Sequence, residues 1–142
     1  MKIDILKKTD VNSTVQNQVS DLFKQLGGNK KQISLTEVLD GKNRITLAYC
    51  TDNDEIIGIA LMCNYNVISG KKGWIEDVVV NSKYRGKGIG RKLMNKLVEI
   101  GKEKNLSEIL LFTEDHRTPA INLYSDLGFK VKDSRIYTIK AK

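Results

Sequence analysis

The stretch from Ile75 to Met94 constrains the fold of this chain more than any other segment. It begins with a short β-branched run, Ile75 to Val80, which predicts a strand. A polar turn at residues 81–84 follows, and the glycine-rich segment from Arg85 to Gly90 opens an amphipathic helix. A helix N-terminus presents free backbone N–H groups, and glycines let an anion approach the main chain closely. The stretch therefore predicts a phosphate-binding site.

The spacing of the glycines narrows the class of phosphate ligand. The lysine and hydroxyl of a G-x-x-x-x-G-K-[ST] loop are absent, and glycines at 86, 88 and 90 lack the G-x-G-x-x-G spacing of a dinucleotide-binding turn. Arg85, Gly88 and Gly90 instead form R-x-x-G-x-G, and residues 120–129 read AINLYSDLGF. In this order, with a helix between them, the two segments resemble the pyrophosphate-binding signature and the late A-x-x-L-Y-x-x-x-G-F segment of the GCN5-related N-acetyltransferases, the GNAT family.

The resemblance covers roughly residues 44–140 and implies a single GNAT domain over residues 1–142. The implied fold is α/β, with three layers in which about four helices flank a mixed central sheet of about six or seven strands. The implied activity is transfer of an acetyl group from acetyl-CoA, the co-substrate, to a primary amine by direct attack in a ternary complex. Neither cysteine lies near either motif, so no acyl-enzyme nucleophile is predicted.

The acceptor implied by the resemblance is a small-molecule amine or a peptide amine. An amino-sugar phosphate is the most specific candidate, because the adjacent Glu76 and Asp77 are similar to a pair at the sugar site of glucosamine-phosphate acetyltransferases. A different class of function stays open, namely an acyl-CoA-binding sensor or regulatory domain without turnover. A homodimer is a further candidate, since dimers are common in the family.

Cofactor binding falls to the glycine-rich turn and the strand before it. In the family, the turn N–H groups bind the pyrophosphate, and the pantetheine arm pairs with the strand where it splays from its neighbour at a bulge. A backbone N–H near Val79 would then polarise the thioester carbonyl. The alternative is a turn that binds nothing. By resemblance, the cofactor-binding residues are Val78, Val79, Val80, Arg85, Gly86, Lys87, Gly88, Ile89, Gly90, Arg91 and Asn122.

Two residues are candidates for catalysis. Tyr124 occupies the position of the family's tyrosine general acid, and the alternative is an aromatic ring that packs under the cofactor. Glu76 is the candidate general base, and Glu76 and Asp77 are the candidate substrate-binding residues; the alternative is structural carboxylates. Strand alternation places the side chains of Glu76 and Asp77 on opposite faces of the sheet.

Hydrophobic periodicity and turn chemistry predict the remaining elements. The expected strands are residues 2–7, 44–50, 55–62, 74–80, 109–112, 129–132 and 136–140. The expected helices run from a cap at Thr9 or Asp10 to Leu26, from Ser34 to Leu39 with Glu37 completing a capping box, from Gly88 to Lys104, and from Thr118 to Leu127.

Composition excludes several classes of function. The net charge is +7, from 24 basic and 17 acidic residues, but the clustering between Lys83 and Lys92 favours a local anion site. Aromatic residues make up 6% of the chain and form no stacking platform, so no nucleic-acid partner is expected. One histidine and two scattered cysteines, Cys50 and Cys63, make no zinc site.

The same sequence predicts a cytoplasmic protein. No apolar run approaches the ~20 residues of a membrane span, so no membrane partner is expected. The segment that follows Met1 has neither the apolar core nor the cleavage site of a signal peptide. Cys50 and Cys63 lie in apolar runs and are expected to be free buried thiols in a reducing compartment.

Overall fold

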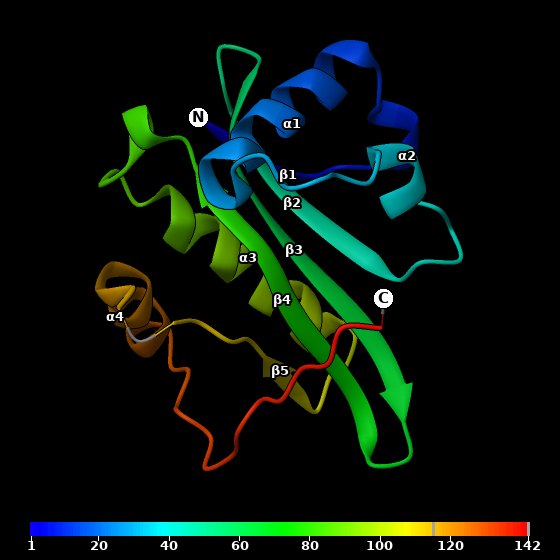
Figure 1. Cartoon of the computed structure of the whole chain (residues 1–142), viewed down its shortest axis with the longest axis vertical. Helices are drawn as coiled ribbons and strands as arrows, with labels where there is room; N and C mark the ends of the chain where they lie inside the picture. The colour runs from blue at the N-terminus through cyan, green and yellow to red at the C-terminus, as the bar shows by residue number, and fades with distance from the viewer. Residues whose placement is uncertain (115, 142) are drawn as a thin grey trace. The chain divides into compact units, whose positions relative to one another are not determined.

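The structure is a computed structural model that describes residues 1–114 and 116–141. The chain forms two compact units, Met1–Phe112 and Thr113–Lys142, and each is described by itself (Figure 1). The expectation of one domain over the whole chain stays a prediction. None of the helices in the described residues is long and apolar enough to cross a membrane.

A five-stranded mixed sheet forms the centre of the first unit, in the order β1-β2-β3-β4-β5 (Figure 1). The first four strands pair antiparallel with their neighbours, and β5 pairs parallel with β4. The strands are β1 (Lys2–Ile5), β2 (Ile45–Asp52), β3 (Glu55–Val67), β4 (Gly70–Val80) and β5 (Glu108–Leu110). The predicted mixed α/β architecture is confirmed, with fewer strands than the expected six or seven.

The prediction of two closing strands at residues 129–132 and 136–140 was wrong. Neither segment is a strand in the structure. Val131 and Ile139, one in each segment, are 101% and 91% exposed, so no layer covers these two apolar side chains. Alternating apolar residues form a strand only where a neighbouring edge pairs with their backbone and a layer covers one face, because β-propensity depends on that context.

Helices α1 (Ser13–Gly27) and α3 (Ile89–Glu103) cover opposite faces of this sheet (Figure 1). Ile59 of β3 packs in the core cluster with the buried residues of α1. The adjacent Gly58 points the other way, since a Cβ there would lie 3.1 Å from side-chain atoms of both Ile89 and Leu93. The absence of a Cβ at Gly58 thus lets the first turn of α3 pack closely on the strand.

The ends of the first two helices are set by side-chain caps. The oxygen Asn12 Oδ1 accepts a hydrogen bond from the N–H of Val15 at 2.8 Å, so α1 starts after Asn12 rather than at the expected Thr9 or Asp10. Asp10 instead accepts from the N–H of Lys7 at 2.9 Å and closes a short 3-10 turn. The predicted cap at Ser34 is confirmed, and it starts the single turn of α2 (Leu35–Val38).

The β3–β4 hairpin extends beyond the expected strand ends, because β3 was expected to stop at Met62 and β4 to start at Trp74. Gly73 lies inside β4 and pairs with Asn64. A Cβ at Gly73 would lie 2.9 Å from Leu106 Cδ1 and 3.0 Å from Met62 Sδ. This glycine is therefore required by close packing inside the strand, and glycine is the residue type that also suggests a turn.

Leu93 tests how far α3 supports the sheet. Its side chain is 0% exposed, so Leu93→Ala should lower the free energy of unfolding by about 2–5 kcal/mol, the cost of a buried leucine truncation. Urea denaturation followed by circular dichroism measures this change. Asn95→Ala, at an exposed position of the same helix, is the control and should stay within about 0.5 kcal/mol of the natural protein. Equal effects of the two substitutions would contradict this role for α3.

Candidate active site

A β-bulge in the middle of β4 sets the geometry of the site. Ile59 of β3 faces Val79 and Leu61 faces Glu76, so the single residue between them, Ala60, lies opposite two residues of β4. Asp77, inside the bulge, has a φ of 51°. A positive φ is uncommon outside glycine, and aspartate tolerates it better than most residues because its short side chain can bond locally. The bulge shifts the alternation of side chains along β4 by one residue.

This shift brings the two carboxylates into one cavity. Glu76 and Asp77 both line a space of about 310 Å³ on the face of the sheet that carries α2. The expectation that they point to opposite faces was wrong, because strict alternation applies only to a strand without a bulge. The other lining residues are Val38, Asn43, Ile45, Leu61 and Cys63.

Glu76 and Asp77 are both exposed residues, but their surroundings still disfavour negative charge on the two carboxylates. Burial raises the pKa of Glu76, and the nearby charge of Asp77 raises it further. Burial also raises the pKa of Asp77, while the positive charge of Lys30 acts in the opposite direction. A carboxylate whose pKa is raised is a stronger proton acceptor, as a general base requires.

Cys63 is a lining residue that the sequence reasoning missed. Both cysteines were expected to be buried and away from both motifs, but Cys63 is partly exposed and lies in the cavity with Glu76 and Asp77. Strand alternation could have placed Cys63 there, because it follows Leu61 by two residues and so lies on the same face of the strand. The other cysteine, Cys50, is buried as expected, and burial raises the pKa of its thiol.

Strands β4 and β5 stay together over a short length only. Their parallel pairing is limited to three residue pairs, from Lys72 with Glu108 to Trp74 with Leu110. Within the described residues, the edge of β4 from Ile75 onward has no strand partner on that side. The main-chain groups on this edge of Val78–Val80 are therefore open to a ligand that lies alongside them, apart from the carbonyl of Val80, which accepts a hydrogen bond from Arg85.

The turn after β4 has an open surface and ends in an uncapped helix. Gly86 and Gly88 have φ values of 81° and 78°, and a Cβ on either would meet no atom within 4 Å. Gly88 is the N-cap of α3 and makes no side-chain cap, so the first N–H groups of this helix are available to an anion. Arg85 closes the turn, since its Nε donates to the carbonyl of Val80 at 3.2 Å.

Tyr84 links the glycine-rich turn to the hairpin between β2 and β3. The Nζ of Lys87 lies 5.1 Å from the centre of the Tyr84 ring, a cation–π contact. The phenol of Tyr84 forms a hydrogen bond with Asp52, which raises the pKa of the phenol. Lys87, a candidate cofactor-binding residue, is thus positioned by contacts that the sequence patterns do not reveal.

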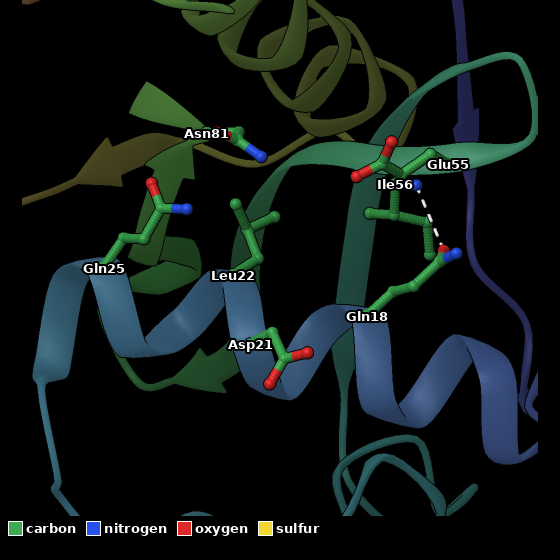
Figure 2. Close-up of a pocket in the computed structure, with 7 residues that line it drawn as sticks. All are labelled: Gln18, Asp21, Leu22, Gln25, Glu55, Ile56 and Asn81. Carbon is green, nitrogen blue, oxygen red and sulfur yellow. Dashed lines mark hydrogen bonds between the residues drawn. The ribbon is translucent and has the colours of Figure 1, made fainter. Parts of the chain in front are cut away.

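A smaller cavity of about 100 Å³ lies where α1 is fastened to the sheet (Figure 2). Gln18 Oε1 accepts a hydrogen bond from the N–H of Ile56 at 3.1 Å. Gln25 Oε1 accepts from the N–H of Ser82 at 2.9 Å and so connects the end of α1 to the residues that lead into the glycine-rich turn. The lining residues are Gln18, Asp21, Leu22, Gln25, Glu55, Ile56 and Asn81.

The second unit contains α4 (Thr118–Asp126), which carries both Asn122 and Tyr124. The Tyr124 ring packs edge-on against Phe129, with ring centres 6.2 Å apart. Burial raises the pKa of Tyr124, and Arg117 lowers it by a smaller amount. The phenol therefore stays protonated at neutral pH, as a proton donor must. Asn122 is exposed.

The model of the Acetyltransferase (GNAT) family matches residues 16–129. The chain belongs to this family. A glucosamine 6-phosphate N-acetyltransferase of Trypanosoma brucei brucei is 31% identical over 111 residues, which are 73% of this chain and 74% of that protein. A thialysine N-epsilon-acetyltransferase of Mus musculus is 38% identical over 64 residues. That match covers 45% of this chain, and only 38% of the relative's length.

Solved GNAT structures have the same fold. The crystal structure of a Trypanosoma brucei acetyltransferase superposes with a TM-score of 0.81 at 22% identity and covers 98% of this chain and 99% of its own. The expected family and the mixed α/β fold are thus confirmed. The roles given to the cofactor-binding residues, to Glu76 and Asp77, and to Tyr124 stay predictions.

The raised pKa values make a prediction about stability. A group whose pKa is higher in the folded than in the unfolded protein disfavours folding once it is charged, and it contributes nothing at a pH where both states are protonated. Both residues are exposed, so solvent screens the effect, and the double substitution Glu76→Gln and Asp77→Asn should stabilise the protein only slightly at neutral pH. The gain should shrink as the pH falls below the ordinary carboxylate range, near 4.

Urea denaturation at about pH 4 and pH 7.5 measures this difference. The control is Glu99→Gln, which removes an exposed carboxylate from α3. A double variant that is less stable than the natural protein at pH 7.5 would show that Glu76 and Asp77 are structural carboxylates.

Proposed function

We propose that this chain is an acetyl-CoA-dependent N-acetyltransferase that acts on a primary amine by direct attack in a ternary complex. One observation carries the proposal. Strand β4 holds Glu76 and Asp77 in a cavity at its bulge and then leads into a glycine-rich, uncapped helix N-terminus. An acceptor site and an anion site thus lie along one strand, separated by the unpaired edge at Val78–Val80.

The cofactor is held by main-chain groups in this proposal. The N–H groups from Gly86 to Gly90 bind the pyrophosphate, and the side chains of Arg85, Lys87 and Arg91 supply positive charge around it. The pantetheine arm pairs with the edge of Val78–Val80 that has no strand partner, where Arg85 already occupies the carbonyl of Val80. The open space where a Cβ would stand on Gly86 or Gly88 supports this, because the ligand needs that space.

The chemical step transfers an acetyl group from sulfur to nitrogen. Glu76 takes a proton from the ammonium group, and the neutral amine nitrogen attacks the thioester carbonyl carbon. A backbone N–H near Val79 donates to the carbonyl oxygen as negative charge develops there. The C–S bond then breaks, and the thiolate takes a proton from Tyr124. The second proton of the nitrogen restores the Tyr124 phenol, and Glu76 releases its proton to solvent. The products are the amide, the CoA thiol and one proton released to solvent.

Thiol release from acetyl-CoA across a panel of amines tests this function. The panel contains diamines, basic amino acids, glucosamine 6-phosphate, aminoglycosides and short peptides. Release well above the hydrolysis blank, with a matching acetylated product by mass spectrometry, is the expected result. No release from any amine, together with a raised melting temperature in acetyl-CoA, would favour a sensor domain without turnover.

Tyr124→Phe tests the general acid. Removing the phenolic proton should lower kcat by about 10-fold or more, within the range for general acid catalysis. The control is Tyr137→Phe, which alters an 87% exposed tyrosine of the same unit and should leave kcat unchanged. Single-turnover kinetics should first establish that chemistry limits the rate. An unchanged single-turnover rate in Tyr124→Phe would eliminate this role.

Glu76→Gln tests the general base through the pH dependence of kcat/KM. The base must be ionised to accept a proton, so the rate of the natural protein should fall as the pH drops through the raised pKa of Glu76. The variant should lose most of its activity and also this acidic limb. Retention of the full pH profile would assign the limb to another group.

A further inference from the structure

The acceptor cavity has a charge pattern that selects among amines. Its seven lining residues include two carboxylates, Glu76 and Asp77, and no lysine, arginine or histidine. Asn43 adds no positive group, and its Nδ2 already donates to the carbonyl of Val38 at 2.8 Å. The polar lining therefore offers a ligand mainly hydrogen-bond acceptors and negative charge.

The remaining wall of the cavity is apolar. Val38, Ile45 and Leu61 provide aliphatic surface, and the Cys63 thiol behaves as a small apolar group. The volume of about 310 Å³ corresponds to roughly ten water molecules. A short methylene chain between two polar ends fits both this size and this surface.

We propose that the acceptor is a small dication, such as a diamine or another basic amine with a second positive group, and that Asp77 binds the charge that does not react. This inference rests on the proposed function and assigns its acceptor class. Glu76 then faces the reacting amine, and the methylene chain lies along the aliphatic wall. A dication also relieves the mutual repulsion of the two carboxylates, which a single ammonium group does only in part.

The same lining disfavours an anionic acceptor. A phosphate group in the cavity would add negative charge beside Glu76 and Asp77, which are both exposed, and no cation among the described lining residues would offset the repulsion. Lys30 is the cation whose charge acts on Asp77, but it lies outside the lining. The amino-sugar phosphate considered from the sequence would therefore have to recruit Lys30.

Matched acceptors test this inference. The ratio of kcat/KM for 1,4-diaminobutane over butylamine should be about tenfold or more, because one charge-assisted hydrogen bond separates the two amines. Asp77→Asn should reduce this ratio to within about twofold, and asparagine tolerates the positive φ at this position. Glu55→Gln removes a carboxylate from the smaller cavity in Figure 2 and should leave the ratio unchanged.

A second arm separates the phosphate alternative. Glucosamine 6-phosphate should be a poorer acceptor than glucosamine, and Lys30→Met should not lower activity toward diaminobutane. Better use of glucosamine 6-phosphate that disappears in Lys30→Met would overturn the proposal. Equal use of butylamine and diaminobutane by the natural protein would also overturn it.

Binding without turnover keeps this test independent of the proposed function. Calorimetry with CoA present should show tighter binding of diaminobutane than of butylamine, and Asp77→Asn should remove the difference. Acetylation of monoamines with equal binding of both ligands would leave the proposed function intact and refute the dication. Selective binding of diaminobutane without acetyl transfer to any amine would refute the function and keep the assignment of the cavity.

Discussion

The bulge at which Ala60 faces both Asp77 and Val78 is the constraint on which the rest of the site depends. Upstream of it, β4 follows regular pairing with β3. At the bulge, Asp77 adopts a positive φ and joins Glu76 in one cavity. Downstream, Val79 returns to the buried face and packs in the core cluster beside α1. One inserted residue thus lets a single strand serve the core, the cavity and the glycine-rich turn.

Local chemistry made the faces of the helices and most of their ends predictable from the sequence, although α1 begins after Asn12 and not at the expected Thr9 or Asp10. The apolar stripe of α3 and the caps at Ser34 and Gly88 are short-range features that few tertiary contacts override. The wrong assignments of strands and turns came where the same residue type is compatible with two kinds of local structure. Gly73 suggested a turn but serves close packing inside β4, and the apolar residues near Val131 suggested a strand that finds no partner edge.

The candidate site was predictable in parts, and the parts differ in their physical origin. The segment from Arg85 to Gly90 carries its own signature, because glycine adopts a positive φ without steric cost and its repetition marks a turn of this kind. The shared cavity of Glu76 and Asp77 has no such signature in the sequence, because a bulge arises from pairing with another strand and leaves no local pattern. Cys63 and Lys30 belong to the surroundings of the cavity for the same reason, through contacts between segments distant in sequence.

The empty surroundings of Gly86 and Gly88 separate two kinds of evolutionary pressure. Most glycines in the core, such as Gly58, exclude a side chain because neighbouring atoms already fill the space. At the turn, an added methyl group would strain the backbone but displace no protein atom. Selection at Gly86 and Gly88 therefore acts less on folding than on the ligand that the turn must bind. A substitution at Gly58 should lower cellular protein level and fitness together, because both depend on folding there. A substitution at Gly86 or Gly88 should lower fitness more than protein level, because fitness also depends on what the turn binds.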